Sequence, residues 1–155
     1  MIVETKEVLE RLSEFPISMY EPGDVVIHED SATNRLLVLQ RGVVDVVKQD
    51  VLLARIDEPG AVFGDMAFIL GRPHTAHVLA STSSSFYVIK DAGTLLDAEP
   101  QVGRYLMVEL AKRLDAVNRL LIDARSAYLE ADKRHGVLDD MFAKIGRALH
   151  IGARD

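Results

Sequence analysis

A glycine followed by an acidic residue opens the segment of this chain that is best suited to hold an anion. Gly64 and Asp65 begin residues 64–70 (GDMAFIL), a run that is long enough for one or two helical turns before Gly71 interrupts it. A glycine at the start of a helix leaves backbone N–H groups that attract negative charge. Asp65 has two open interpretations, since its carboxylate either caps the helix or accepts hydrogen bonds from ligand hydroxyls.

Polar residues with more than one possible role follow this run. His74 is interpreted as a half-exposed loop histidine, although a protonated His74 would bind a phosphate in a pH-dependent way. Thr75 either donates its hydroxyl proton to a phosphate or bonds to the backbone of its own loop. By residue type alone, Phe63, Met66 and Val78 are expected in the protein core.

Short β-like segments surround this region and must position it. Strands are expected at residues 24–28, 36–40, 43–48, 51–56, 77–80 and 86–89, with a hairpin around Gln49 and Asp50. Turn signals such as Pro22-Gly23 and Arg41-Gly42 separate them. Many short strands at near-regular spacing indicate an antiparallel β-barrel of the jelly-roll or double-stranded β-helix (cupin-like) type.

Helical patterns flank the strands on both sides. Residues 4–15 have the spacing of a short amphipathic helix, and a long helix is expected after Pro100. The apolar positions of the long helix repeat every 3.5 residues, which predicts a homodimer seam that contains Leu110, Leu114, Val117 and Leu121. A break near His135-Gly136 and a final short helix over residues 137–149 complete the expected architecture.

Composition excludes several classes of function. The chain has 155 residues, a formal net charge of −6 and no cysteine. Disulfides, thiolate metal sites and cysteine nucleophiles are therefore impossible, and the charge argues against a nucleic-acid partner such as DNA. No catalytic triad and no histidine spacing typical of a metal site is present, so we expect a non-enzymatic protein without metal or cofactor. Neither a signal peptide nor a membrane span is recognisable, so a cytoplasmic location is expected.

Several motifs, in order, resemble the cyclic nucleotide-binding domain family, whose fold is found in the catabolite activator protein. They are residues 20–24 (YEPGD), 36–46 (LLVLQRGVVDV), 63–67 (FGDMA) and 75–78 (TAHV), followed by 110–114 (LAKRL) and 117–120 (VNRL) in the long helix. The resemblance covers roughly residues 15–125. It places residues 1–125 in the domain, with residues 126–155 as a helical extension and no DNA-binding domain.

The resemblance implies a ligand site and the roles of its residues. The family's phosphate-binding cassette corresponds to Phe63, Gly64, Asp65, Met66, Ala67, His74, Thr75 and Ala76, with Asn118 reaching the base from the long helix. Asp65 stands where the family has a Glu for the ribose 2′-hydroxyl, and His74 stands where it has an Arg for the phosphate.

Two functions therefore remain open. One is a regulatory sensor of cAMP or cGMP that signals through movement of its C-terminal helix. The alternative is a degenerate domain that serves as a dimerisation or protein-interaction module.

Overall fold

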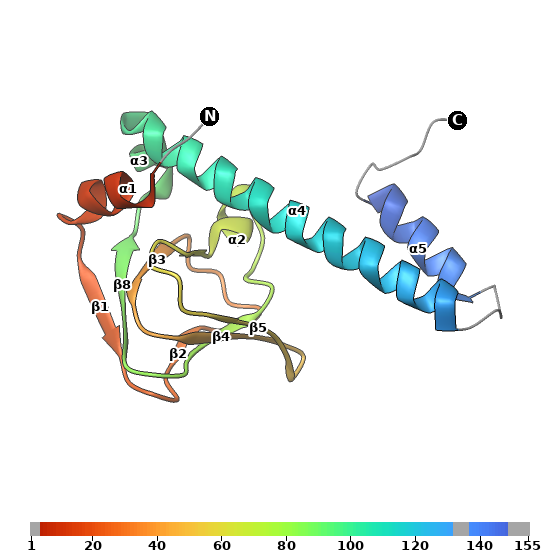
Figure 1. The fold of residues 1–155 in the computed structure, drawn as a ribbon. Coiled ribbons are helices and arrows are strands. Elements are labelled where there is room, and N and C mark those ends of the chain that lie inside the picture. The colour runs from red at the N-terminus through yellow and green to blue at the C-terminus, as the bar shows by residue number, and fades with distance from the viewer. Residues whose placement is uncertain (1–3, 132–136, 149–155) are drawn as a thin grey trace. The chain divides into compact units, whose positions relative to one another are not determined.

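The structure, a computed structural model, describes residues 4–131 and 137–148. It divides into two compact units, Met1–Ala111 and Lys112–Asp155. The long helix α4 (Pro100–Ala131) begins in the first unit and continues in the second, which also contains α5 (Val137–Ala148) (Figure 1). The expected limit of the domain at residue 125 stays a prediction.

The first unit contains two four-stranded antiparallel sheets. One sheet has the order β1-β8-β3-β6 and the other has the order β2-β7-β4-β5. The strands are β1 (Ile17–Tyr20), β2 (Val25–Ile27), β3 (Leu36–Arg41), β4 (Val44–Lys48), β5 (Val51–Ile56), β6 (Val62–Phe63), β7 (His77–Ala80) and β8 (Ser84–Ile89). The predicted class, mainly antiparallel β of the jelly-roll type with flanking helices, is confirmed. The sheets do not close into one barrel, because no strand ladder joins them within the described residues.

The β3 and β8 strands form the centre of the molecule because both of their faces are covered. Successive side chains of a strand point to opposite faces of the sheet. Leu37 and Leu39 pack in the cluster between the two sheets, whereas Leu36 and Val38 pack in a second cluster beneath the helices. A strand that is covered on both faces needs a continuous apolar run, which residues 36–39 provide (LLVL).

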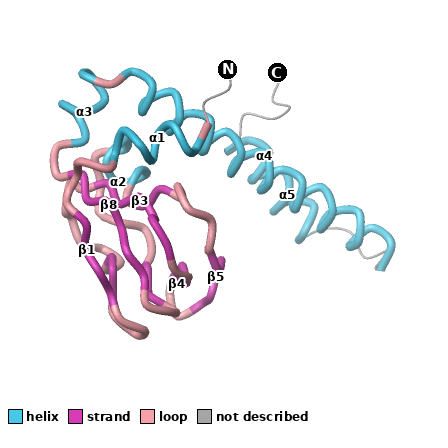
Figure 2. The backbone as a smooth tube through the Cα atoms, turned by 60° about the vertical axis from the view of Figure 1, so that its left-hand side comes forward, coloured by secondary structure: helices cyan, strands magenta, loops and turns pink. Residues whose placement is uncertain are grey.

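Helices α1 (Thr5–Leu12) and α3 (Ala92–Ala98) lie at the same end of the sheets, beside the start of α4 (Figures 1 and 2). Val8 and Leu12 of α1 are almost fully buried in the cluster beneath the helices, together with Tyr105 and Leu106 of α4. The Tyr105 hydroxyl donates a 2.9 Å hydrogen bond to the carbonyl oxygen of Gly60. The start of α4 is therefore fixed directly to the turn that precedes β6.

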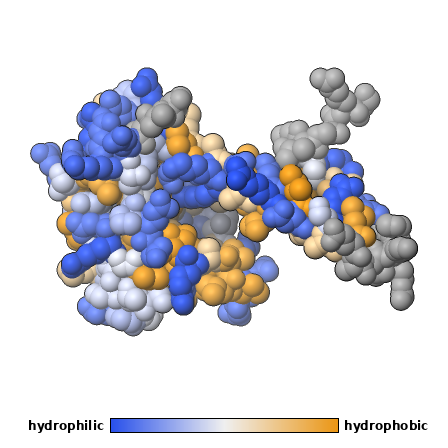
Figure 3. Space-filling view, in the orientation of Figure 1, coloured by the Kyte–Doolittle hydropathy of each residue, from blue (hydrophilic) through white to orange (hydrophobic). Residues whose placement is uncertain are grey.

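The predicted β4–β5 hairpin is confirmed. Gln49 and Asp50 have φ values of 48° and 62°, the left-handed pair that a two-residue hairpin turn requires. Val51, Leu52 and Leu53 of the edge strand β5 are each more than half exposed, and an apolar patch is visible over this hairpin in Figure 3. An exposed apolar edge strand of this kind is a potential interaction surface.

The long helix is confirmed, and its predicted seam carries exposed apolar side chains. Leu114 is 48% exposed and Val117 is 52% exposed. Within the second unit, the guanidinium of Arg125 lies over the ring of Phe142 of α5, 5.9 Å from its centroid. The predicted final helix is confirmed as α5, whereas the predicted break at His135-Gly136 lies outside the described residues. No helix in the described ranges is long and apolar enough to cross a membrane.

Candidate functional site

A glycine in a left-handed conformation opens the candidate site. Gly64 follows β6 directly, has φ 85° and is the N-cap of the six-residue helix α2 (Asp65–Leu70). A Cβ atom at this position would lie 2.5 Å from the carbonyl oxygen of Arg35 and 3.3 Å from Cε1 of His74. Both the backbone conformation and the close approach of Arg35 therefore require glycine here. The predicted helical turns after Gly64 are confirmed.

Asp65 is buried at the first position of α2. Its exposed fraction is 3%, and the N-cap of the helix is Gly64. The interpretation of Asp65 as the N-cap is therefore wrong, because the chain already takes a helical course at Asp65. A buried carboxylate one residue inside a helix requires polar partners, and its position leaves the interpretation as a ligand contact open.

The three residues expected in the core differ in their surroundings. Phe63 and Val78 are buried in the cluster between the sheets, as predicted. Met66 is 43% exposed, so its assignment to the core is wrong. Met66, the second residue of α2, is therefore accessible from solvent. Met66 is consequently available to a ligand, whereas Phe63 acts on the site through packing.

His74 is buried, not half-exposed as predicted from the sequence. Its exposed fraction is 4%, because the loop between β2 and β3 folds over it. The His74 backbone N–H donates to the carbonyl oxygen of Ser31, and its own carbonyl accepts from the N–H of Asp30, both at 2.8 Å. The ring nitrogen Nε2 lies 2.6 Å from Oγ1 of Thr33. Three hydrogen bonds thus join His74 to residues 30–33.

This environment favours the neutral imidazole. Burial lowers the pKa of His74 below its usual value, and the positive charge of Arg35 lowers the pKa further. The phosphate contact through a protonated His74 that the sequence left open is disfavoured, because both causes oppose protonation near neutral pH.

Arg35 lies beside the candidate site, although no motif in the sequence indicated it. It precedes β3, which pairs with β6 through Leu37 and Phe63. The ladder ends at Phe63, one residue before Gly64, so the start of β3 lies beside the start of α2. The contact between Gly64 and the Arg35 carbonyl agrees with this placement. In the sequence, Arg35 is only an arginine at the start of an expected strand. It indicates a place near Gly64 only when the partner of that strand is known.

The remaining predicted site residues fall into two groups. Ala67, Thr75 and Ala76 are half-buried and lie with His74 in the first unit. Asn118 lies in the second unit, where its Oδ1 is buried and accepts no hydrogen bond. Its contact with a base stays a prediction.

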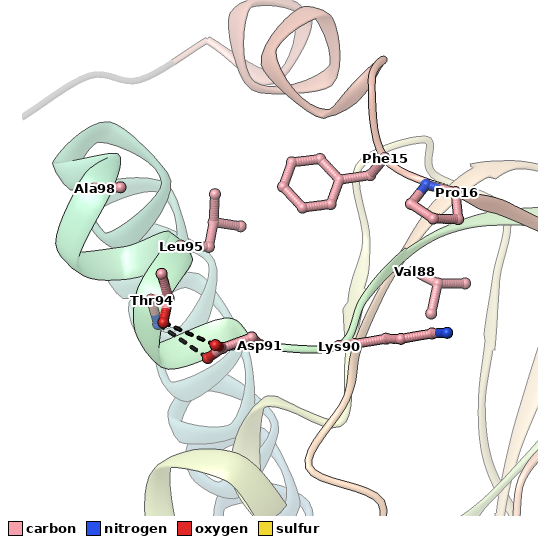
Figure 4. Close-up of a pocket in the computed structure, with 8 residues that line it drawn as sticks. All are labelled: Phe15, Pro16, Val88, Lys90, Asp91, Thr94, Leu95 and Ala98. Carbon is pink, nitrogen blue, oxygen red and sulfur yellow. Dashed lines mark hydrogen bonds between the residues drawn. The ribbon is translucent and has the colours of Figure 1, made fainter.

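A separate apolar hollow of about 430 Å³ lies where β8 meets α3. Figure 4 shows Leu95 of α3 and Phe15 on facing sides, with Val88 and Lys90 along another wall. Asp91 accepts hydrogen bonds from the backbone N–H of Thr94 at 3.1 Å and from its hydroxyl at 2.8 Å. The hollow thus borders the first turn of α3 and none of its lining residues belongs to the 63–76 segment.

A metal centre is not formed by the described part of the chain. No group of three or more His, Asp or Glu side chains there is arranged to hold a metal ion.

The chain is similar to known cyclic nucleotide-binding proteins. The family model described as "Cyclic nucleotide-binding domain" matches residues 18–94. The potassium/sodium hyperpolarization-activated cyclic nucleotide-gated channel 3 of Rattus norvegicus is 22% identical over 148 residues, 92% of this chain and 19% of the channel. The cGMP-dependent protein kinase of Plasmodium berghei (strain Anka) is 30% identical over 70 residues, 45% of this chain and 8% of the kinase. The chain thus spans less than a fifth of the length of these relatives.

Solved structures agree on the fold. The catabolite activator protein of Thermus thermophilus has a TM-score of 0.65 at 24% identity, covering 80% of this chain and 61% of that chain. A cyclic nucleotide-binding domain from Methylobacillus flagellatus has a TM-score of 0.61 at 22% identity, covering 88% and 79%. The matched segment contains Gly64, Asp65 and His74. Through residues 18–94, the chain belongs to the cyclic nucleotide-binding domain family.

Proposed function

We propose that this chain is a regulatory domain that binds cAMP or cGMP at the segment from Phe63 to Ala76. One observation carries the proposal. Gly64 takes a left-handed conformation with no room for a side chain, and it leads directly into a helix whose first residue is the buried Asp65. This arrangement lies inside the segment that the family model matches.

Each predicted site residue has a proposed role. Asp65 accepts a hydrogen bond from a ribose hydroxyl, since a carboxylate is an acceptor with several lone pairs. The backbone N–H groups at Asp65, Met66 and Ala67 and the hydroxyl of Thr75 donate to the cyclic phosphate. The half-buried Ala76 leaves room beside them, and Phe63 holds the segment in place through the core.

The proposed output is a shift of the helices that follow β8. The hollow between Phe15 and Leu95 gives α3 room to move toward the sheets, and α4 follows after a single residue, Glu99. A ligand that binds one helix position more tightly shifts the population toward that position. We further propose that Asn118 contacts the base and that the seam with Leu114 and Val117 forms a homodimer.

Calorimetric titration with cAMP and cGMP tests the binding proposal. The wild-type chain is expected to bind at least one of them with micromolar affinity, and 5′-AMP and 5′-GMP more weakly. Asp65→Ala should weaken binding by about 10- to 100-fold, because it removes a charge-assisted hydrogen bond. The exposed Asp57→Ala is the matched control and should leave the affinity unchanged. Equal affinity of the wild-type chain and Asp65→Ala would remove the proposed role of Asp65.

A degenerate domain that acts as an interaction module is the second candidate. The burial of His74 favours it, because the residue at the family's arginine position is buried against Thr33, where burial lowers its pKa. Absence of calorimetric heat with millimolar cAMP and cGMP would favour this candidate. Neither candidate assigns a catalytic residue, and the cytoplasmic location stays a prediction.

A further inference from the structure

Arg35 keeps its hydrogen-bond donors available. Arg11 pairs with Glu99 at 2.8 Å, and Arg55 pairs with Asp45 at 2.7 Å. Arg35, in contrast, is exposed and lies within ion-pair distance of no acidic group in the part of the chain that the structure describes. A guanidinium presents five N–H donors in a planar arrangement that matches the oxygens of a phosphate.

The backbone of Arg35 is fixed on both sides. Leu36, the next residue, is 2% exposed in the cluster beneath the helices. The Arg35 carbonyl oxygen meets the α-carbon of Gly64 so closely that a Cβ atom there would be 2.5 Å away. Arg35 is therefore anchored at the residue where the candidate phosphate segment begins.

His74 holds the loop that leads to Arg35. Its backbone bonds to Asp30 and Ser31 and its ring bonds to Thr33, so the loop is attached two residues before Arg35. The ring Nε2 already contacts Thr33 and the side chain is buried, so the imidazole is not exposed to a ligand. The positive charge of Arg35 is close enough to the ring to lower its pKa.

We infer that Arg35 supplies the guanidinium that binds the phosphate in this domain, and that His74 is a positioning residue that holds the loop of residues 30–33 and thereby Arg35. The inference rests on the proposed function, since it assigns the phosphate contact of the same site. The segment after α2 has a histidine, not an arginine, at position 74. Arg35, at the end of the loop between β2 and β3, thus provides the cation.

Arg35→Ala tests the inference, with Arg72→Ala as the matched control. Arg72 is exposed like Arg35, but it follows the C-terminal end of α2, whereas the Arg35 carbonyl lies next to Gly64 at the start of α2. Arg35→Ala should weaken binding of cAMP and cGMP by about 10- to 100-fold and leave binding of the nucleosides adenosine and guanosine unchanged. Arg72→Ala should leave the affinities for all four compounds unchanged. Equal cyclic nucleotide affinity of the wild-type chain and Arg35→Ala overturns the inference.

Inorganic phosphate gives a readout that does not depend on cyclic nucleotide binding. An NMR titration of the wild-type chain should shift the Nε–H signal of Arg35 and leave that of Arg72 in place. If this occurs while cAMP and cGMP fail to bind, the proposed function fails and the role of Arg35 stands. If phosphate leaves the Arg35 signal unmoved, the inference fails.

The positioning role of His74 has its own test. His74→Ala removes the bond to Thr33 and should reduce the phosphate-induced shift of Arg35. His74→Gln keeps an amide that reaches the Thr33 hydroxyl and should restore the shift. Nucleoside binding should remain unchanged in both variants. An undiminished phosphate response in a folded His74→Ala overturns the positioning role.

Discussion

At the scale of single residues, Gly64 and Gly71 differ in what a methyl group would meet. Both have positive φ values, 85° and 60°, at the two ends of α2, but only Gly64 faces a backbone atom within 4 Å. Gly71→Ala should lower the free energy of unfolding by about 1 kcal/mol, the cost of the left-handed conformation. Gly64→Ala should lower it by about 3 kcal/mol, because the clash with Arg35 adds to that cost. Urea denaturation measures both, and equal losses would contradict the observed packing.

The stability of the domain should depend on pH through His74. Burial and Arg35 lower its pKa in the folded state, so the unfolded chain binds the proton more readily. The contribution is therefore complete above about pH 6.5, the unperturbed histidine value, and is lost as the pH falls toward the folded pKa. The free energy of unfolding should decrease from pH 7.5 to pH 5.5, and less so in His74→Gln. The same pH dependence in both proteins would show that other groups cause it.

The glycine that opens a short helix could be predicted from the sequence, whereas the loop that covers His74 could not. A helix that begins after Gly64 depends only on neighbouring residues, so the residue types were sufficient to predict it. The burial of His74 depends on a loop about forty residues earlier in the chain, and a single sequence does not indicate which loop folds over which residue. The involvement of Arg35 was missed for the same reason.

At the scale of elements, the sequence predicted the strands and helices whose apolar pattern is clear, and it did not predict the shortest elements. The expected strands at residues 51–56 and 77–80 agree with β5 and β7 in both limits. The two-residue strand β6 (Val62–Phe63) and the seven-residue helix α3 were not predicted. Neither is long enough to show a period, and both are stabilised by packing against the sheets and helices. The predicted jelly-roll class is confirmed, and its strands form two sheets that no ladder joins within the described residues; this pairing could not be predicted from the strand positions alone.

The N-cap of α3 should set the stability of the segment that joins the sheets to α4. Asp91 accepts two hydrogen bonds from Thr94, which also lower the pKa of its carboxyl group. Asp91→Ala should lower the free energy of unfolding, because the backbone N–H and hydroxyl of Thr94 lose their acceptor. Asp97→Ala, an exposed change in the same helix, should alter it by less than about 0.5 kcal/mol. Thermal unfolding of the two variants gives the comparison, and a larger loss in Asp97→Ala would argue against the cap.

At the scale of the whole molecule, the exposed seam of α4 predicts self-association. Leu114 and Val117 expose about half of their surface, and such apolar faces are commonly covered in the functional assembly. The wild-type chain should sediment as a dimer at tens of micromolar, and Leu114→Asp should sediment as a monomer. Ile122→Asp, at a more exposed position off the seam, should remain a dimer. A monomeric wild-type chain would contradict the proposed dimer.

The layered arrangement explains why binding and output are expected to be coupled. The sheet with β3 and β8 contacts the second sheet on one face and the helices α1, α3 and α4 on the other. The start of β3 meets Gly64, and the end of β8 leads into α3. One rigid sheet thus connects the candidate ligand site to the helices proposed to move.

Chemical-shift mapping by NMR tests the central claim, cyclic nucleotide binding at the segment from Phe63 to Ala76, most directly. Addition of cAMP or cGMP to the isotope-labelled chain should shift the backbone signals of residues 63–67 and 74–76, with saturation at micromolar to submillimolar ligand. Absence of shifts at millimolar concentrations of both ligands, or shifts confined to residues around the hollow such as Phe15 and Leu95, would contradict the claim.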